Sequence, residues 1–234
     1  MKSINIDNAW RGADRCKNCA IRHLVLFADL DHEDFDRIHH PIDDIEYMPG
    51  SRIYMQGDDM PFVYTIRSGL VKLVQRLPNG DRRIVRLLSQ GDLAGLESLN
   101  GQAADHEAVT MDHVKVCRIP RSVIESLRRD TPRLHDALIQ RWQKALSGAD
   151  NWITQLTTGN ARVRVVRLLL LLSTNSEDDS FFLPTREDMG AMLGITTESV
   201  SKVTAELGRN GWLKTLKQHR AWIDAEVLQS HVEN

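Results

Sequence analysis

The sequence predicts an α+β chain in which a β-rich N-terminal part is followed by a long helix and a C-terminal winged helix-turn-helix. Three observations predict it: glycine turns between short alternating runs, a heptad spacing of apolar residues after Pro132, and a helix, glycine turn and second helix near the C-terminus. We expect boundaries at 1–122 for the N-terminal segment and roll, 123–158 for the dimerisation helix region, and 159–234 for the winged helix-turn-helix.

The N-terminal part carries the strongest hairpin signal in the chain. Val71–Gln75 and Arg83–Leu87 alternate in polarity and flank the turn at Asn79-Gly80. Further glycine turns separate other short runs. Many short strands at this spacing predict a barrel or jelly-roll arrangement.

A long helix is predicted from Thr131-Pro132, a capped start with proline at the first helical position. Apolar residues then recur at alternating spacings of three and four, which is the heptad pattern of a helix that pairs with a second helix. This expected dimer seam consists of Ile139, Trp142, Leu146, Ala149, Ile153 and Leu156. A helix packed on its own domain is the alternative. A two-fold dimer would read a palindromic site with half-sites about one helical turn apart.

The C-terminal part contains the helix-turn-helix pattern. Thr185 is placed to cap a first helix, which would pack Met189, Met192 and Leu193 inward before the turn at Gly194. The second helix is apolar on one side, at Val200, Val203 and Leu207. Its other side is polar, at Glu198, Ser201, Lys202 and Arg209. A second helix of this kind enters the major groove, so the pattern predicts binding to double-stranded DNA.

The residues around this helix are locally basic. From Thr197 to Arg220 there are five basic side chains and two acidic ones, and two short alternating runs, Trp212–Leu216 and Arg220–Ile223, predict a hairpin wing. Lysines and arginines in a wing would meet phosphates, which fixes the register on DNA without reading sequence.

Composition narrows the function class. The chain has 234 residues and a formal net charge of -2, so its basic character is local rather than global. The longest apolar run, Val163–Leu172, is interrupted by Arg164 and Arg167 and is too short to span a bilayer. With no signal segment, we expect no membrane association and a cytoplasmic location. No phosphate-binding glycine loop, nucleophile elbow or paired-acid motif is present, so we do not expect an enzyme.

Across nearly its whole length the chain resembles the CRP/FNR transcription regulators. The resemblance is carried by Tyr64–Gly69 and Gly91–Gly95 in the roll, and by Glu198-x-x-Ser201-Lys202 in the second helix, which is similar to the Glu-x-x-Ser-Arg triplet of the FNR branch. It implies a cyclic-nucleotide-binding-like β-roll and a homodimer that binds promoter DNA and acts on RNA polymerase. Base edges would be met by Glu198, Ser201 and Lys202, with Thr197 and Arg209 beside them. Lys202 departs from the arginine of the family pattern.

The three cysteines are Cys16 and Cys19, in a C-x-x-C pair, and Cys117, in a Val-Cys-x-Ile-Pro run. In the oxygen-sensing branch that this chain resembles, cysteines at such positions hold an iron–sulfur cluster, so the resemblance implies a [4Fe–4S] or [3Fe–4S] metal site at these three residues. A third N-terminal cysteine would fall at Val25, which leaves the set one thiolate short. The fourth ligand could be non-cysteine, with Asp14, His23, Asp29 and His32 nearby. Alternatively, three thiolates hold the cluster, or the cysteines form a thiol-redox set without a cofactor.

The resemblance raises two other ligand classes for the roll, haem and a cyclic nucleotide. Haem would need an axial histidine, and His39-His40, His106 and His113 are available without diagnostic spacing, so a haem-based nitric oxide or carbon monoxide sensor is an alternative. The cyclic-nucleotide branch holds a phosphate with an Arg-Ser pair, where this chain has Asp105-His106-Glu107-Ala108. Glu107 would repel a cyclic phosphate, so cyclic nucleotide binding is not expected.

One position in the seam bears on mechanism. The oxygen-sensing branch carries an aspartate there whose charge separates the cluster-free protein, and the corresponding residue is Ala149. Without a charge to bury, we predict a dimer that survives the loss of its ligand.

Overall fold

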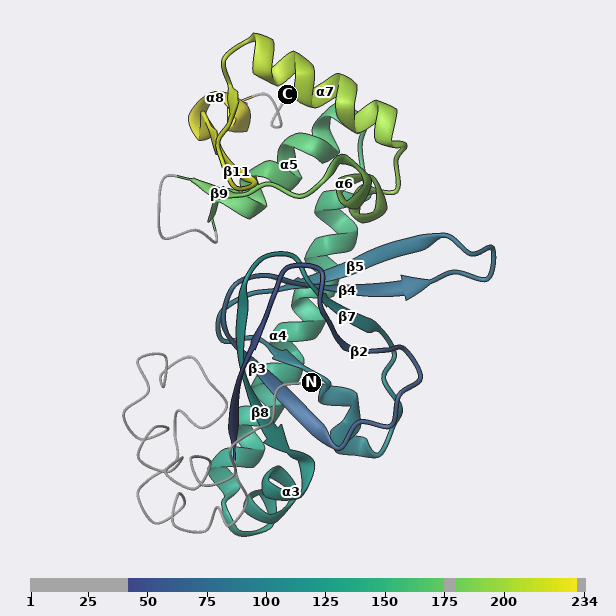
Figure 1. Cartoon of the computed structure of the whole chain (residues 1–234), viewed down its shortest axis with the longest axis vertical. Helices are drawn as coiled ribbons and strands as arrows, with labels where there is room; N and C mark the ends of the chain where they lie inside the picture. Colours follow the sequence, from purple (N-terminus) through teal and green to yellow (C-terminus); the bar gives the residue numbers. More distant parts are fainter. Residues whose placement is uncertain (1–41, 175–179, 231–234) are drawn as a thin grey trace. The chain divides into compact units, whose positions relative to one another are not determined.

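The computed structural model describes residues 42–174 and 180–230, and shows the predicted α+β arrangement of a β-roll and a winged helix-turn-helix (Figure 1). Two compact units divide the described residues. The first contains those up to Gln75 together with Leu87–Leu146, and the second contains Arg76–Arg86 and those from Ser147 onward. Cys16, Cys19, Asp14, His23, Asp29, His32 and His39-His40 lie outside the described residues.

The roll is built from two antiparallel four-stranded sheets. One has the strand order β1-β8-β3-β6 and the other β2-β7-β4-β5. The strands are β1 (Asp43–Tyr47), β2 (Arg52–Tyr54), β3 (Phe62–Ser68), β4 (Val71–Arg76), β5 (Arg82–Leu88), β6 (Leu93–Ala94), β7 (Glu107–Thr110) and β8 (Val114–Pro120), with a short 3-10 helix η3 (Leu96–Asn100) between β6 and β7. Because β8 lies between β1 and β3, residues far apart in the sequence become direct neighbours on one sheet.

The hairpin predicted around Asn79-Gly80 is confirmed as β4 and β5. The amide of Leu77 donates to the carbonyl of Asp81 at 2.9 Å, and Gly80 has a φ of +88°, in the region that favours glycine. This turn joins the two runs, which lie side by side as neighbouring strands of one sheet.

Two helices follow the roll. Helix α3 spans Arg121–Asp130 and helix α4 spans Pro132–Leu156, with Thr131 between them. Leu127 of α3 and Leu134 and Leu138 of α4 pack with Val63 and Ile119 of the sheet in one buried apolar cluster. This burial fixes the first turns of α4 on the roll, because apolar area removed from water stabilises the contact.

The second unit is helical with a small sheet. Helix α5 (Ala161–Thr174) buries Val165, Val166, Leu168, Leu169 and Leu172. It is followed by β9 (Phe181–Phe182), α6 (Arg186–Leu193), α7 (Thr197–Arg209), β10 (Leu213–Thr215), β11 (Arg220–Ile223) and α8 (Ala225–Ser230). The three strands pair in the order β10-β11-β9. Among the helices described, none is long and apolar enough to cross a bilayer.

Candidate nucleic-acid interface and sensor roll

Helix α6 and its turn have the predicted form. The hydroxyl of Thr185 accepts a hydrogen bond from the amide of Asp188 at 3.1 Å, which satisfies one free amide at the helix start. Met189, Met192 and Leu193 are buried, and the helix ends at Gly194 with a φ of +65°. The left-handed conformation at Gly194 reverses the chain toward α7.

Gly190 was not predicted from the sequence to have a role. It determines how closely the turn between α6 and α7 approaches the backbone of α6. A methyl group at this position would lie 2.8 Å from the carbonyl oxygen of Ile195. The chain therefore passes over α6 at a distance that only glycine allows. A glycine inside an otherwise helical pattern was the available signal.

Helix α7 presents a polar face to solvent. Its first residues are capped by Thr196, whose hydroxyl accepts from the amide of Ser199 at 3.2 Å. Val200, Val203 and Leu207 are buried. The five side chains predicted to meet DNA, Thr197, Glu198, Ser201, Lys202 and Arg209, are all exposed. Glu198, Ser201 and Lys202 stand three and four residues apart, so they share one side of the helix.

An ion pair helps to hold α7 against α5. Arg162 Nε lies 3.1 Å from Glu206 Oε1, and both side chains are about one-third exposed. Glu206 is engaged with Arg162, and the other acidic residue of α7, Glu198, is exposed in its first turn.

The predicted wing is present as β10 and β11. Lys214 and Lys217 are exposed, and the ammonium of Lys214 lies 5.0 Å from the centre of the Trp222 ring. Arg220 instead reaches Ser180, with its Nε 3.0 Å from the hydroxyl oxygen. Between the strands Gln218 and His219 both have φ values near +60°, as a two-residue hairpin turn requires. The sequence did not signal this turn, because glycine and asparagine are absent from it.

Cys117 is the one member of the predicted cysteine set that lies within the described residues. It sits in the middle of β8, opposite Asp44 on β1 and Thr65 on β3, and its side chain is partly exposed. Its thiol donates a hydrogen bond to Asp44 Oδ1, with 3.4 Å between the two atoms. Within residues 42–174 and 180–230, no three His, Cys, Asp or Glu side chains are grouped as a metal site would require.

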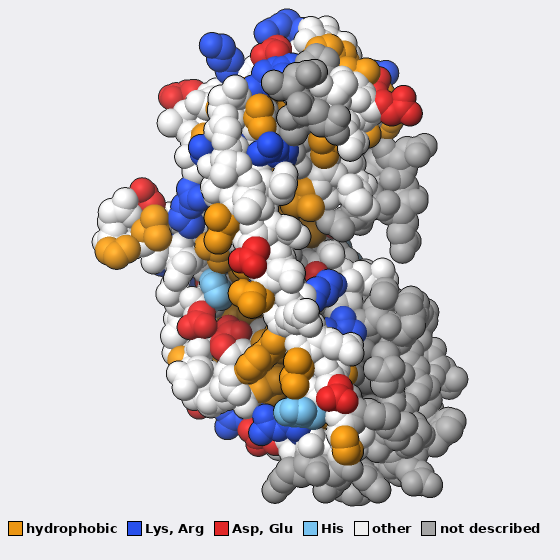
Figure 2. All heavy atoms as spheres, turned by 180° about the vertical axis from the view of Figure 1, so that it is seen from behind, with side chains coloured by type: hydrophobic (Ala, Val, Ile, Leu, Met, Phe, Trp, Pro, Cys, Tyr) orange, Lys and Arg blue, Asp and Glu red, His pale blue; other side chains and the backbone are white. Residues whose placement is uncertain are grey.

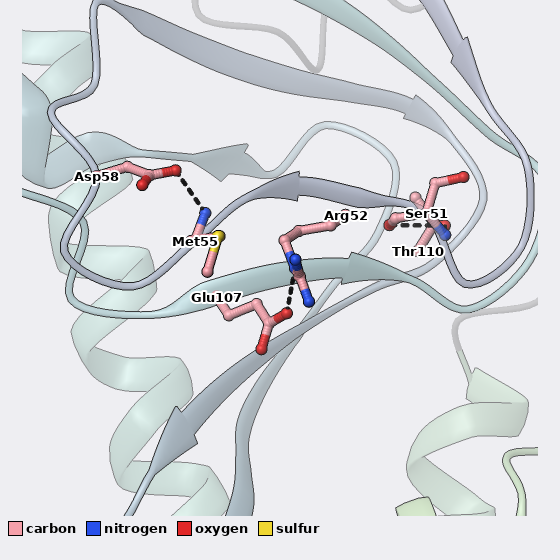
Figure 3. A network of polar contacts seen from close by, with 6 residues as sticks. All are labelled: Ser51, Arg52, Met55, Asp58, Glu107 and Thr110. Atoms are coloured by element: carbon pink, nitrogen blue, oxygen red, sulfur yellow. Dashed lines mark hydrogen bonds and ion pairs between the residues drawn. The ribbon is translucent and has the colours of Figure 1, made fainter.

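Glu107 is paired inside the roll. Its carboxylate accepts from Arg52 Nε at 2.5 Å, and only 8% of the Glu107 side chain is exposed (Figure 3). In the same network Thr110 Oγ1 accepts from the amide of Ser51 at 2.9 Å. Glu107 is therefore an ion-paired carboxylate, and no local sequence pattern indicates that Arg52 is its partner.

Two aromatic side chains are also buried in the roll. The rings of Tyr54 and Tyr64 stack with 6.0 Å between their centres. Burial raises the pKa of Tyr64, so its hydroxyl stays protonated at neutral pH.

The outer face of α4 carries large exposed apolar side chains. Ile139, Trp142, Leu146 and Ile153 are 52%, 42%, 65% and 59% exposed. Figure 2 shows hydrophobic side chains gathered on the side of the molecule opposite to the view of Figure 1. Ala149 is partly exposed, whereas Leu156 is only 1% exposed. The exposed stripe therefore ends at Ile153, because Leu156 is buried within its own chain.

Comparison with known proteins agrees with this architecture. The family model described as the cyclic nucleotide-binding domain matches residues 44–131, and the Crp-like helix-turn-helix domain matches residues 163–230. The transcriptional activator protein FnrL of Cereibacter sphaeroides is 30% identical over 84% of this chain and 83% of its own length. The fumarate and nitrate reduction regulatory protein of Vibrio cholerae is 28% identical over 84% of this chain and 80% of its own.

Solved structures share the fold. FixK2 from Bradyrhizobium japonicum superposes with a TM-score of 0.73 at 24% identity, covering 82% of this chain and 97% of its own. A CRP-family transcriptional regulator from Thermus thermophilus superposes with a TM-score of 0.71 at 25% identity, covering 81% and 97%.

A β-roll of the cyclic nucleotide-binding type joined to a Crp-like helix-turn-helix defines a DNA-binding transcription regulator and not an enzyme. The chain belongs to the CRP/FNR family, as the relatives and solved structures show together with both domain matches.

Proposed function

We propose that this chain works as a homodimer that reads a palindromic promoter site with α7 and responds to redox state or a gas through an iron–sulfur centre. The observation that carries the proposal is the exposed polar face of α7, which stands on a capped helix above a buried apolar face. The promoter-bound dimer would act on RNA polymerase in the cytoplasm.

Base reading is assigned to Glu198, Ser201 and Lys202. A glutamate carboxylate accepts from the amino group of cytosine, and a lysine donates to the O6 and N7 acceptors of guanine. Ser201, between them on the same face, suits either role. Thr197 lies at the helix start beside Glu198, and Arg209 at the helix end is suited to a phosphate.

The reading assignment is tested with fluorescence anisotropy on a half-site chosen by selection from random duplexes. Glu198→Ala is expected to lose about 1–3 kcal/mol of discrimination against a changed base pair. Glu226→Ala in α8, another exposed glutamate, is the matched control and should leave discrimination unchanged. Equal affinity of the unmodified protein for selected and scrambled duplexes would contradict the assignment.

Dimer formation is assigned to Ile139, Trp142, Leu146, Ala149 and Ile153 of α4. Four of these are large apolar side chains left in water on one helix face, and burying such a patch against a second copy is favourable. A two-fold pair of α7 helices would then meet two half-sites of a palindrome. Leu156, the sixth predicted member, is buried within its own chain and is not part of the exposed stripe.

The sensing centre is assigned to Cys16, Cys19 and Cys117. Cys117 packs on one side against the apolar cluster of the roll, and it suits a ligand role because its thiol is partly exposed and donates to a carboxylate. The names of the relatives, regulators of fumarate and nitrate reduction, support a response to respiratory conditions. When bound, an iron–sulfur centre supplies a group that oxidants alter, and the three thiolates of this chain would hold it.

The sensing proposal is tested by purifying the protein without oxygen and counting iron and acid-labile sulfide per chain. About four irons with a broad absorbance band lost in air support it. A sharp Soret band would identify a haem sensor in its place. Neither iron nor chromophore would leave a thiol-redox regulator without cofactor.

A further inference from the structure

The connection between α4 and α5 is short and closely defined. Residues 157–160 separate the two helices. Gly159 has a φ of +84°, in the left-handed region that favours glycine, and the side chain of Asn160 accepts a hydrogen bond from the amide of Val163 at 3.0 Å. The left-handed turn at Gly159 and the Asn160 cap together set the direction in which α5 leaves α4.

Arg167 of α5 reaches back to the end of α4. Its Nη1 donates to the carbonyl of Gln155 at 3.3 Å and to the hydroxyl of Thr158 at 3.2 Å. The last carbonyl groups of a helix have no partner within the helix, and an arginine side chain is able to satisfy them. This side chain therefore joins the end of α4 to the second turn of α5.

Arg164, one turn earlier on α5, joins two other segments of the same compact unit. Its Nε donates to the carbonyl of Gly159 at 2.9 Å, and its Nη1 donates to the carbonyl of Leu193 at 3.2 Å. Gly159 belongs to the connection, whereas Leu193 is the last residue of α6, directly before the turn at Gly194 that leads to α7. Because a guanidinium group is planar and rigid, its two donors fix the positions of the two carbonyl groups relative to each other. One side chain thus ties the connection after α4 to the turn of the helix-turn-helix.

We propose that Arg164 sets the angle between the end of α4 and the helix-turn-helix, and that this angle determines which spacing of two half-sites the dimer binds best. The inference rests on the proposed function, because spacing is defined only for a dimer that pairs through α4 and reads DNA with α7. Arg164 is a positioning residue, which acts on α7 through the carbonyl of Leu193.

A small change of this angle is sufficient to change the preferred spacing. The 14 residues of α5 extend about 20 Å, at a rise of about 1.5 Å per residue. A rotation of about 10° at Gly159 would displace a point about 20 Å away by about 3.5 Å, which is close to the rise of about 3.4 Å per base pair. Both reading helices of a two-fold dimer would move, so the best spacing would change by about one to two base pairs.

The test uses the full chain and duplexes with two copies of the selected half-site, separated by spacers that are varied one base pair at a time. Fluorescence anisotropy measures the Kd for each spacer and for a duplex with a single half-site. The unmodified protein is expected to bind its best spacer at least about tenfold more tightly than spacers about two base pairs longer or shorter, because only one geometry lets both half-sites be bound together.

Arg164→Met keeps the approximate length of the side chain and removes both donors. Its preference for the best spacer is expected to fall below about threefold, because the angle at the connection is then free to vary. Its Kd for the single half-site is expected to change by less than about twofold, because one reading helix binds there without a second.

Arg162→Met is the matched control. Arg162 lies on the same helix and pairs with Glu206 at 3.1 Å, a contact that joins α5 to α7 rather than to the connection. Its replacement should retain the spacing preference. Arg164→Gln, which keeps one donor group, should lose the preference as Arg164→Met does, and it decides the matter if Arg164→Met does not fold. Circular dichroism and the melting temperature report the fold of each variant.

The outcomes separate this inference from the proposed dimer. An unchanged spacing preference in a folded variant of Arg164 would overturn the inference and leave the dimer standing. An equal loss of affinity for single and paired half-sites would also overturn it, because that result identifies a DNA contact or a general loss of structure. No spacing preference in the unmodified protein, despite tight binding to the single half-site, would overturn both the dimer and the inference.

Discussion

The guanidinium of Arg52 on β2 donates to the carboxylate of Glu107 on β7 at 2.5 Å, across 55 residues of sequence. The two ends of the contact differ in environment, since 49% of the Arg52 side chain is exposed and 8% of the Glu107 side chain is. The charge that gains more from the contact is therefore the glutamate, because it is the more deeply buried of the two.

Arg52→Ala is expected to lower the free energy of unfolding by about 1–3 kcal/mol, because it leaves the Glu107 carboxylate buried without this donor. Urea titration followed by circular dichroism measures the change. Arg128→Ala, which removes an exposed arginine of α3, is the control and should stay within about 0.5 kcal/mol of the unmodified protein. If both variants unfold at the same urea concentration, the pair contributes nothing.

The seam proposal predicts that Leu146→Glu weakens self-association. Fully burying a leucine is worth about 1.5–3 kcal/mol, and 1.4 kcal/mol corresponds to a tenfold change, so the dimer Kd should rise at least about tenfold. Sedimentation velocity over a range of concentrations reports it. Gln143→Glu places the same charge at an exposed polar position of the same helix and should have a smaller effect. Identical sedimentation of both variants and the parent would refute the seam.

Because Ala149 puts no charge in the seam, the metal-free protein is expected to remain dimeric. Chelation followed by sedimentation velocity checks this. A monomer after metal removal would show that assembly itself is the response. A persistent dimer would support a response through the orientation of the reading helices.

Lys202→Arg should sharpen guanine preference. Arginine offers two parallel donors to the acceptors of guanine, whereas lysine offers a flexible point charge. Discrimination against a substituted base at that position is expected to rise by about 1–3 kcal/mol, measured by competition anisotropy. Arg209→Lys is the reverse exchange at the other end of the helix and should leave base preference unchanged. Parallel shifts in affinity for every duplex would mean that residue 202 meets a phosphate.

Two glycines of the helix-turn-helix should respond oppositely to alanine. At Gly190 the added methyl group would meet the Ile195 carbonyl oxygen at 2.8 Å, so Gly190→Ala should destabilise the protein by about 1–3 kcal/mol. At Gly208 the nearest atom is 3.9 Å away, and alanine should stabilise α7 by about 0.5–1 kcal/mol. Thermal unfolding distinguishes the two variants. A shift of the melting temperature in the same direction for both would show that the turn after α6 can move to accommodate the methyl group at position 190.

Local patterns were sufficient for much of this molecule. The Thr185 cap, the Gly194 turn and the Asn79-Gly80 hairpin were predicted because each depends on residues within a few positions of one another. The polar face of α7 was predicted for the same reason, since helical spacing alone places Glu198, Ser201 and Lys202 on one side. The sequence by itself thus determined the fold class and the helix proposed to read DNA.

Only the tertiary structure decided which distant residues meet. Asp44 lies beside Cys117 across 73 residues, and Glu107 finds Arg52 across 55, because strand order and register bring β1 to β8 and β2 to β7. The heptad spacing could not show that Leu156 is buried within its own chain. Spacing defines which side chains share a helix face, but it does not say whether that face packs on the same chain or on a second copy. Pairing between remote strands is selected by the burial of both partners at once, and no local window of sequence contains that information.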